Sequence, residues 1–179
     1  MNPTGHCTST SKLREGEVED IVLDVGCGEK KLVDAIGVDI RRIVGVDVVA
    51  DARYLPFKNE VFDRVYSSHT LEHISHLELK DAVKEWVRVL KPGGKLEIRC
   101  PYLRIRALIF FLNPSWKNVR NIYGEQDNAG NFHMSGFSFG LLKALLEECG
   151  ITKIKRFNRG YMGIPFIPDC LHVVGTKKT

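Results

Sequence analysis

The stretch Ile21-Val-Leu-Asp-Val-Gly-Cys-Gly28 constrains the fold more than any other part of the sequence. Its short apolar run, rich in β-branched residues, is typical of a buried strand in a parallel sheet. Gly26 and Gly28 allow a sharp turn and a close approach of the backbone to a ligand, because neither carries a Cβ. Ligands of open parallel sheets lie beyond the carboxyl ends of the strands. The turn therefore predicts the floor of a binding site.

A dinucleotide site is the first alternative for this turn. The dinucleotide fingerprint G-x-G-x-x-G has a third glycine, whereas this chain has Lys31 at that position. Glu29 would also place a negative charge where a diphosphate must lie. A glycine turn that only reverses the chain is a second alternative, and the two glycines alone do not exclude it.

Composition narrows the class of protein. The chain has 179 residues, which predicts one domain with a sizeable core. Its net charge of +4 permits an anionic partner but does not predict nucleic-acid binding. The five cysteines are scattered and form no C-x-x-C, so we expect reduced thiols of a cytoplasmic protein and no zinc site. We find no apolar run long enough to span a bilayer and no signal-peptide core.

The order of the remaining segments alternates strands and helices. Residues 1–20 are polar and aperiodic, and we expect a flexible tail before a single domain over residues 21–179. Only one or two helical turns fit between the glycine turn and the next strand. Ser75 and Glu78 have the spacing of a capping box, and apolar residues behind them recur at helical intervals. Strands are expected at residues 36–40, 44–50, 61–66 and 95–100.

The second half of the chain is less regular. Residues 101–137 have no single period, and we interpret them as an insertion over the active site that is partly helical around residues 103–112. Ser138 is the expected N-cap of a helix over residues 137–149, which Gly150 ends. Two further strands are expected at residues 151–157 and 171–176, separated by a loop rich in glycine and proline.

This order resembles the class I S-adenosylmethionine-dependent methyltransferases, and specifically the small methyltransferase type 11-like group. The matching segments are DVGCG (24–28), GVDI (37–40), VADARYLPF (49–57), FDRVYSSHTLEH (62–73) and RVLKPGGKLEI (88–98). The resemblance implies an α/β, Rossmann-like, doubly wound and mostly parallel seven-stranded sheet. The first crossover is shorter than that family's usual full helix.

The resemblance also implies a cofactor, S-adenosyl-L-methionine, and its product S-adenosyl-L-homocysteine. An acid that ends the second strand accepts hydrogen bonds from the ribose hydroxyls, and Asp39 matches it. Asp51 and Ala52 match the adenine position. Asp24 either orients the glycine loop or accepts a hydrogen bond from the ammonium group. The remaining residues implied to line the methionine end are Gly26, Cys27, Gly28, Ser67, Ser68 and His69.

Methyl transfer from a sulfonium requires mainly that the acceptor is held in line with the breaking bond. An oxygen or ring-nitrogen acceptor also requires a base, for which histidine is suited near neutral pH. The expected catalytic residues are His69, after the fourth strand, and His133, in the insertion. His73 is better explained as a structural residue of the following helix.

His69-Thr-Leu-Glu-His73 also matches the zinc motif H-x-x-E-H. It directly follows a predicted strand, and a zinc site leaves the other segments unexplained, so we predict no metal. The expected partner is a small-molecule acceptor, with a lipid or sugar included, and a homo-oligomer is compatible. The alternatives are a non-catalytic cofactor-binding partner subunit and an RNA or protein methyltransferase, although nucleic acid is not indicated.

Overall fold

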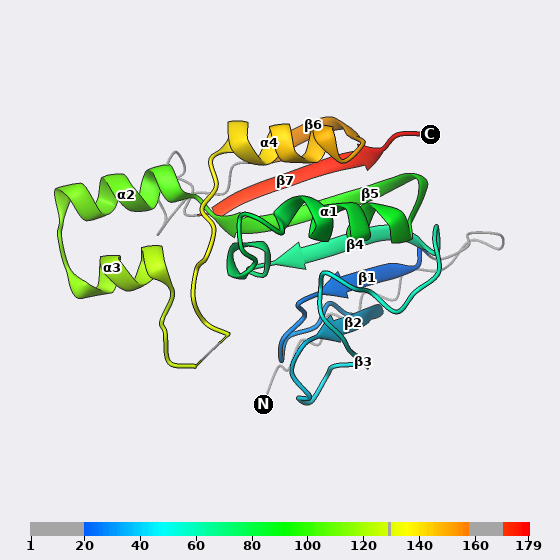
Figure 1. The fold of residues 1–179 in the computed structure, drawn as a ribbon, viewed down its shortest axis with the longest axis horizontal. Helices are drawn as coiled ribbons and strands as arrows, with labels where there is room; N and C mark the ends of the chain where they lie inside the picture. Colours follow the sequence, from blue (N-terminus) through cyan, green and yellow to red (C-terminus); the bar gives the residue numbers. More distant parts are fainter. Residues whose placement is uncertain (1–19, 129, 158–169) are drawn as a thin grey trace, which may run out of the picture.

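The computed structural model describes residues 20–128, 130–157 and 170–179 (Figure 1). A seven-stranded sheet has the order β3-β2-β1-β4-β5-β7-β6. The strands from β3 to β5 are parallel, and β7 is antiparallel to both β5 and β6. The predicted mostly parallel sheet is therefore confirmed. The strands are β1 Val22–Val25, β2 Ala35–Asp39, β3 Val48–Val49, β4 Phe62–Ser68, β5 Leu90–Pro101, β6 Ile151–Phe157 and β7 Cys170–Lys177.

The amphipathic helix predicted behind Ser75 is α1, Leu79–Val89, and its apolar stripe is buried. Trp86 is fully buried and its Nε1 donates a hydrogen bond of 2.8 Å to the Ala52 carbonyl, which ties α1 to the loop after β3. The predicted capping box is wrong. The N-cap residue is Glu78, which forms no side-chain cap and instead accepts a hydrogen bond of 2.5 Å from Arg53.

The second predicted helix is α4, Phe139–Glu148. Its N-cap prediction is confirmed, because the Ser138 hydroxyl accepts a hydrogen bond from the Leu141 amide. Leu142 and Leu146 point into the core. Helices α1 and α4 lie on the same side of the sheet (Figure 1), which places the main core between these helices and the strands.

The connection from β1 to β2 is short, as expected for the first crossover. Residues 26–34 form turns without the expected helical turn, and no helix occurs in the described chain before the short 3-10 helix η1, Leu71–His73. The Lys31 side chain instead packs against Gly37, because a Cβ added to Gly37 would lie 2.5 Å from Lys31 Cδ. Lys31 Nζ forms an ion pair with Asp47 Oδ2 at 2.7 Å. These loops leave Val33 and Val44 86% and 92% exposed.

Strand boundaries differ from expectation at two places. β3 is only two residues long, although the apolar run around it is longer, because only Val48 and Val49 pair with β2. β5 begins at Leu90 and continues through the Pro-Gly-Gly segment, since Leu90 pairs with Phe62 before the register shifts. The turn residues are therefore accommodated by an irregularity in the pairing of β5 with β4.

The face of the sheet opposite α1 and α4 carries an ion network. Glu97 on β5 is 7% exposed and accepts hydrogen bonds from Arg64 at 2.5 Å and Arg99 at 3.1 Å, while His172 Nε2 lies at 2.8 Å. Both guanidinium groups also stack over the Tyr66 ring. Burial raises the pKa of Glu97, but the cations outweigh it and lower the pKa overall. Charged groups thus pair with one another on this face, where a parallel sheet ordinarily buries apolar residues, although Arg99 Nε is buried without a hydrogen-bond partner among the described residues.

The predicted insertion contains the helices α2, Leu103–Leu112, and α3, Trp116–Tyr123. They extend from the carboxyl end of β5 to one side of the sheet (Figure 1). The helix predicted around residues 103–112 is confirmed, and none of its side chains is buried. The predicted tail lies outside the described residues except for Asp20, as does the predicted loop over residues 158–169.

Candidate functional site

The candidate site lies where the strand order reverses. β1 is followed along the chain by β2 on one side, while β4 pairs with it on the other, so the carboxyl ends of β1 and β4 form the switch point of the sheet. The glycine turn Gly26–Gly28 follows β1 there, and Ser67 to Thr70 follow or end β4. The residues predicted from these two segments are therefore brought together.

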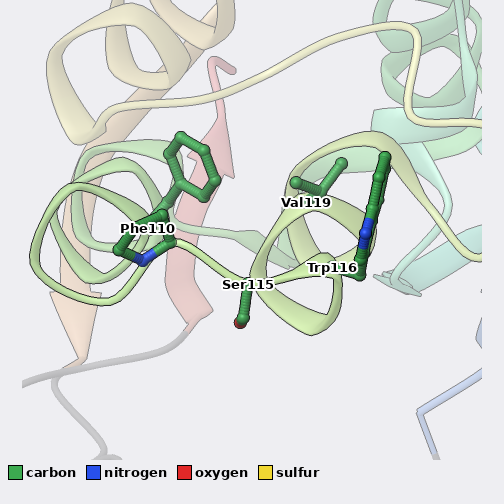
Figure 2. Close-up of a pocket in the computed structure, with 5 residues that line it drawn as sticks. Phe110, Ser115, Trp116 and Val119 are labelled. Carbon is green, nitrogen blue, oxygen red and sulfur yellow. The ribbon is translucent and has the colours of Figure 1, made fainter.

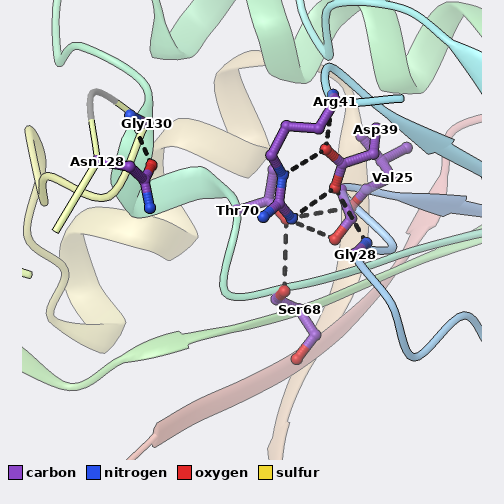
Figure 3. Close-up of polar contacts among 9 residues, drawn as sticks. Val25, Gly28, Asp39, Arg41, Ser68, Thr70, Asn128 and Gly130 are labelled. Carbon is purple, nitrogen blue, oxygen red and sulfur yellow. Dashed lines mark hydrogen bonds and ion pairs between the residues drawn. The ribbon is translucent and has the colours of Figure 1, made fainter. Parts of the chain in front are cut away.

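Hydrogen bonds join the two segments. The Ser67 hydroxyl donates to the Val25 carbonyl at 3.0 Å. The Thr70 hydroxyl lies 3.2 Å from the same oxygen (Figure 3). Gly26 has a φ of +71°, and a Cβ there would lie 2.0 Å from Thr70 Oγ1. The glycine is thus required both for the turn and for this close approach.

The amides of the glycine turn are already used within the protein. Gly26 and Cys27 donate to the Val38 carbonyl at 2.7 and 3.0 Å, and Gly28 donates to Asp39 Oδ2 at 3.0 Å. The turn is thus fastened to β2. The backbone carbonyl oxygens of the turn are the groups still able to bind a ligand. Because they only accept hydrogen bonds, they suit an ammonium group better than a phosphate.

Asp39 ends β2 and is 6% exposed. Its carboxylate accepts hydrogen bonds from the Gly28 amide, the Arg41 amide at 2.9 Å and Arg41 Nε at 3.0 Å (Figure 3). Burial raises the pKa of Asp39, but the hydrogen bonds from Arg41 and Gly28 outweigh it and lower the pKa overall. Asp39 is therefore an ionised, preoriented acceptor, and Arg41 is its present partner.

Asp51 repeats this arrangement after β3. Arg53 donates to its carboxylate from the amide at 2.9 Å, from Nε at 2.9 Å and from Nη2 at 2.6 Å, and these contacts lower the pKa of Asp51. Sequence reasoning proposed both acids but did not single out Arg41 and Arg53, which the structure places against them. The repeated Asp-x-Arg pattern was the available signal, because an aspartate ending a strand readily bonds the backbone two residues on.

Several other predicted residues are buried and hold the loops of the site in place. Asp24 is 2% exposed and accepts a hydrogen bond of 2.9 Å from the Leu32 amide, so it orients the glycine loop. Ser67 is 1% exposed and its hydroxyl is engaged by β1. Ala52 offers its carbonyl to Trp86. Cys27 is 8% exposed, and burial raises the pKa of its thiol to about 11.

His69 follows β4 with a φ of +55°, a strained conformation for a non-glycine residue. Its Nε2 lies 3.5 Å from Cys170 Sγ and its Nδ1 lies 3.1 Å from Glu72 Oε1. Cys170 and Glu72 together raise the pKa of His69 to about 10. A protonated imidazole cannot accept a proton, so this arrangement does not suit the predicted role of His69 as a base.

His133 lies on a different segment from His69. Its Nδ1 is 2.9 Å from the Ile122 carbonyl, and desolvation lowers its pKa. The His73 and His133 rings meet edge to face with centroids 5.2 Å apart. The structure therefore places His133 beside His73 and Glu72 at the end of η1. A neutral imidazole at this place retains a lone pair.

A separate pocket of about 260 Å³ lies between α2 and α3, lined by Phe110, Pro114, Ser115, Trp116 and Val119. Figure 2 shows Phe110 on α2 and Val119 on α3 on either side of it. Large apolar side chains surround the pocket, and Phe111 and Trp116 are 81% and 83% exposed. This surface is outside the strand-end site and adds an apolar feature to the insertion.

Comparison with known proteins shows which family has a similar sequence and fold. Residues 47–98 match the family model of a methyltransferase domain. A solved S-adenosylmethionine-dependent methyltransferase from Thermotoga maritima superimposes with a TM-score of 0.65 at 19% identity, covering 90% of this chain and 84% of that chain. The chain has the fold of the class I methyltransferases, and its central segment resembles their methyltransferase domain.

Two relatives that are similar in sequence to this chain differ in what their names say they act on. A probable tRNA methyltransferase 9B from Mus musculus is 36% identical over 101 residues, which are 48% of this chain and 23% of that protein. A demethylmenaquinone methyltransferase from Renibacterium salmoninarum is 32% identical over 122 residues, which are 68% of this chain and 44% of that protein. The chain therefore spans less than half the length of either relative.

Proposed function

We propose that the domain binds S-adenosylmethionine across the carboxyl ends of β1, β2 and β4 and transfers its methyl group to an acceptor. The observation that carries this proposal is Asp39, an ionised carboxylate preoriented by Gly28 at the switch point of the sheet. A ribose diol supplies two hydroxyl donors to such a carboxylate. The half-exposed Arg41 occupies that acceptor and is free to turn toward solvent, since its side chain is 57% exposed.

The other cofactor contacts follow from position. Gly26, Cys27 and Gly28 present their carbonyl edge to the methionine end, and Ser68 and His69 approach the transferring methyl from β4. Asp51 and Ala52 face the adenine. Asp24 and Ser67 act through the loops that they fix rather than by direct contact.

Methyl transfer here depends on positioning more than on acid–base chemistry, because the sulfonium is an excellent leaving group. The charged His69 suits orientation of an acceptor or the cofactor carboxylate. His133 is the better candidate for accepting a proton, since desolvation keeps its imidazole neutral near pH 7.

A small apolar molecule is the acceptor class that we favour, with lipids included. Helix α2 buries none of its residues, and the pocket beside Phe110 and Trp116 offers an apolar surface at the end of α2 that lies away from β5 (Figure 1). A demethylmenaquinone methyltransferase among the relatives supports this class.

RNA is the second acceptor class, favoured by the tRNA methyltransferase relative and by Arg104, Arg106, Lys117 and Arg120 on the same two helices. Phosphate contacts weaken steeply with salt, so RNA binding that stays constant between 50 and 200 mM salt excludes this class. No helix in the described part of the chain has the length and apolarity needed to cross a membrane.

The test is calorimetric titration of the purified protein with S-adenosylhomocysteine, with NAD as the matched control. Micromolar binding of S-adenosylhomocysteine alone supports the proposal. Binding of NAD alone overturns it. A protein that binds the cofactor product but methylates neither quinone-like acceptors nor RNA supports the partner-subunit alternative.

A further inference from the structure

Three side chains converge at the end of β4, outside the proposed cofactor contacts. His133 is one of them, and an ion bound here would use the lone pair with which His133 accepts a proton, so these two roles of His133 exclude one another. Glu72 and His73 belong to η1, and His133 lies on the segment that returns from α3 toward α4. One ligand atom from each, a carboxylate oxygen or an imidazole nitrogen, lies within 4.8 Å of the other two. The cluster thus combines two imidazoles and one carboxylate from segments far apart in the sequence.

The backbone holds this convergence in place. The amides of Met134 and Ser135 both donate to the Glu72 carbonyl, at 2.8 and 3.0 Å. The His133 amide donates to the Tyr123 carbonyl at 2.9 Å, which ties the same segment to the end of α3. The returning segment is therefore fastened on both sides of His133.

Both histidines contact a backbone carbonyl through Nδ1. His73 Nδ1 lies 3.0 Å from the Phe132 carbonyl, and His133 Nδ1 lies 2.9 Å from the Ile122 carbonyl. A carbonyl oxygen only accepts, so each Nδ1 carries the proton and each Nε2 keeps its lone pair. Histidines that bind metals are commonly oriented in this way by a backbone carbonyl behind the ring.

Glu72 supplies the observation that points to a ligand. Its side chain is 1% exposed, Oε1 lies 3.1 Å from His69 Nδ1, and Oε2 is buried with no hydrogen-bond partner in the described part of the chain. An unpaired buried carboxylate oxygen is costly. A cation bound between Glu72 and the two imidazoles would remove that cost.

We propose that Glu72, His73 and His133 bind one divalent transition-metal ion. Two nitrogen ligands and one oxygen favour zinc, manganese, iron or cobalt over magnesium and calcium. Bonds of about 2.1 Å place neighbouring ligand atoms about 3 to 3.5 Å apart, so small side-chain rotations close the site from 4.8 Å. Three protein ligands leave positions open for water or another oxygen.

This site differs from the H-x-x-E-H zinc motif in the sequence. That motif uses His69 and His73, whereas His69 here contacts Glu72 and Cys170. His69 therefore contacts the Glu72 carboxylate instead of the ion, and His133 takes the place of His69 as the second nitrogen ligand. If the proposed methyl transfer is correct, the coordination positions of the ion that no protein residue fills would be available to a methyl acceptor. The ion would then favour an acceptor that carries a hydroxyl group.

The experiment is titration of the chelator-treated full chain with Zn²⁺ by calorimetry and with Co²⁺ by visible absorption, without cofactor or acceptor. We expect one equivalent to bind with micromolar or tighter affinity. Glu72→Gln and His133→Asn should each weaken metal binding by about 100-fold or more. Replacing a residue that only supports a ligand typically weakens binding by no more than about 100-fold, so a larger loss identifies a direct ligand. His76→Asn is the matched control, because His76 is exposed and outside the cluster.

Circular dichroism and thermal unfolding of each metal-free variant show whether it is folded. Absence of one-equivalent binding by the folded parent overturns the proposal. An equal loss in His76→Asn indicates surface histidines and also overturns it. Loss in His69→Asn with full binding by His133→Asn assigns the ion to the sequence motif instead. Binding of S-adenosylhomocysteine to the metal-free protein separates failure here from failure of the proposed function.

Discussion

The sharpest test of the cofactor site is the replacement of Asp39, paired with replacement of the arginine that now contacts it. If Asp39 binds the ribose diol, Asp39→Asn keeps the shape of the side chain but replaces one acceptor oxygen by an amide donor, so one hydrogen bond is lost and the other becomes neutral. A hydrogen bond to a charged group contributes about 1.5–3 kcal/mol and a neutral one about 0.5–1.5 kcal/mol, so the loss is about 2.5–4.5 kcal/mol. With about 1.4 kcal/mol per tenfold in affinity, Asp39→Asn should weaken S-adenosylhomocysteine binding by about 10²- to 10³-fold.

Arg41→Ala should act in the opposite direction. The guanidinium must leave Asp39 before a ribose can bind, and its side chain is 57% exposed. An ion pair so exposed contributes about 0.2–1 kcal/mol, so its removal should strengthen binding by up to about fivefold. The two substitutions lie two residues apart and therefore serve as controls for one another.

Calorimetric titration of both variants and the parent measures these changes, with thermal unfolding to confirm that each is folded. Binding by Asp39→Asn within about threefold of the parent would refute the role of this acid, since the expected loss of hydrogen bonding is much larger. A loss in Arg41→Ala as large as that in Asp39→Asn would show that Arg41 itself contacts the ligand.

Three further predictions concern stability and reactivity. Glu97→Gln should lower the free energy of unfolding, measured in urea at pH 7, by about 2 kcal/mol, because it leaves partly buried cations unpaired. Folding lowers the pKa of Glu97, so the stability that this carboxylate contributes is present above about pH 4.5 and is lost as the pH falls. The stability of the variant should therefore depend less on pH below pH 5 than that of the parent. Cys27 has a thiol pKa of about 11, so iodoacetamide should modify it far more slowly at pH 8 than an unfolded-state thiol, and rapid modification of the native protein would contradict the burial. Gly26→Ala should destabilise the protein and abolish cofactor binding because its Cβ meets Thr70 Oγ1, and Thr70→Ala should restore part of the stability in the double variant measured by thermal unfolding.

Local patterns in the sequence were sufficient to predict much of the fold. The period of α1 and the N-cap Ser138 of α4 depend on neighbouring residues, and both are confirmed. The acids Asp39 and Asp51 could be proposed from the sequence because each follows an apolar run that ends at the carboxyl edge of the sheet. Their arginine partners are equally local but were not recognised.

Features that depend on distant segments were not predictable in the same way. The contacts of Glu97 require the register of β4, β5 and β7, which no local pattern encodes. The meeting of His133 with Glu72 depends on the path of the chain after α3. The capping box failed for the same reason, since Glu78 pairs with Arg53 from a separate loop rather than with its own helix end.

The loops that join β1, β2 and β3 have a consequence for the lifetime of the folded state. Val33 and Val44 lie almost fully in solvent, and β3 pairs through two residues only, so this edge of the sheet is weakly anchored. Amides there should exchange with solvent through local opening long before those of β4 and β5. A ligand at 100 times its dissociation constant stabilises the state that binds it by about 2.7 kcal/mol, a large part of an ordinary domain's stability. Occupancy of this edge would therefore govern how long the domain resists unfolding and proteolysis.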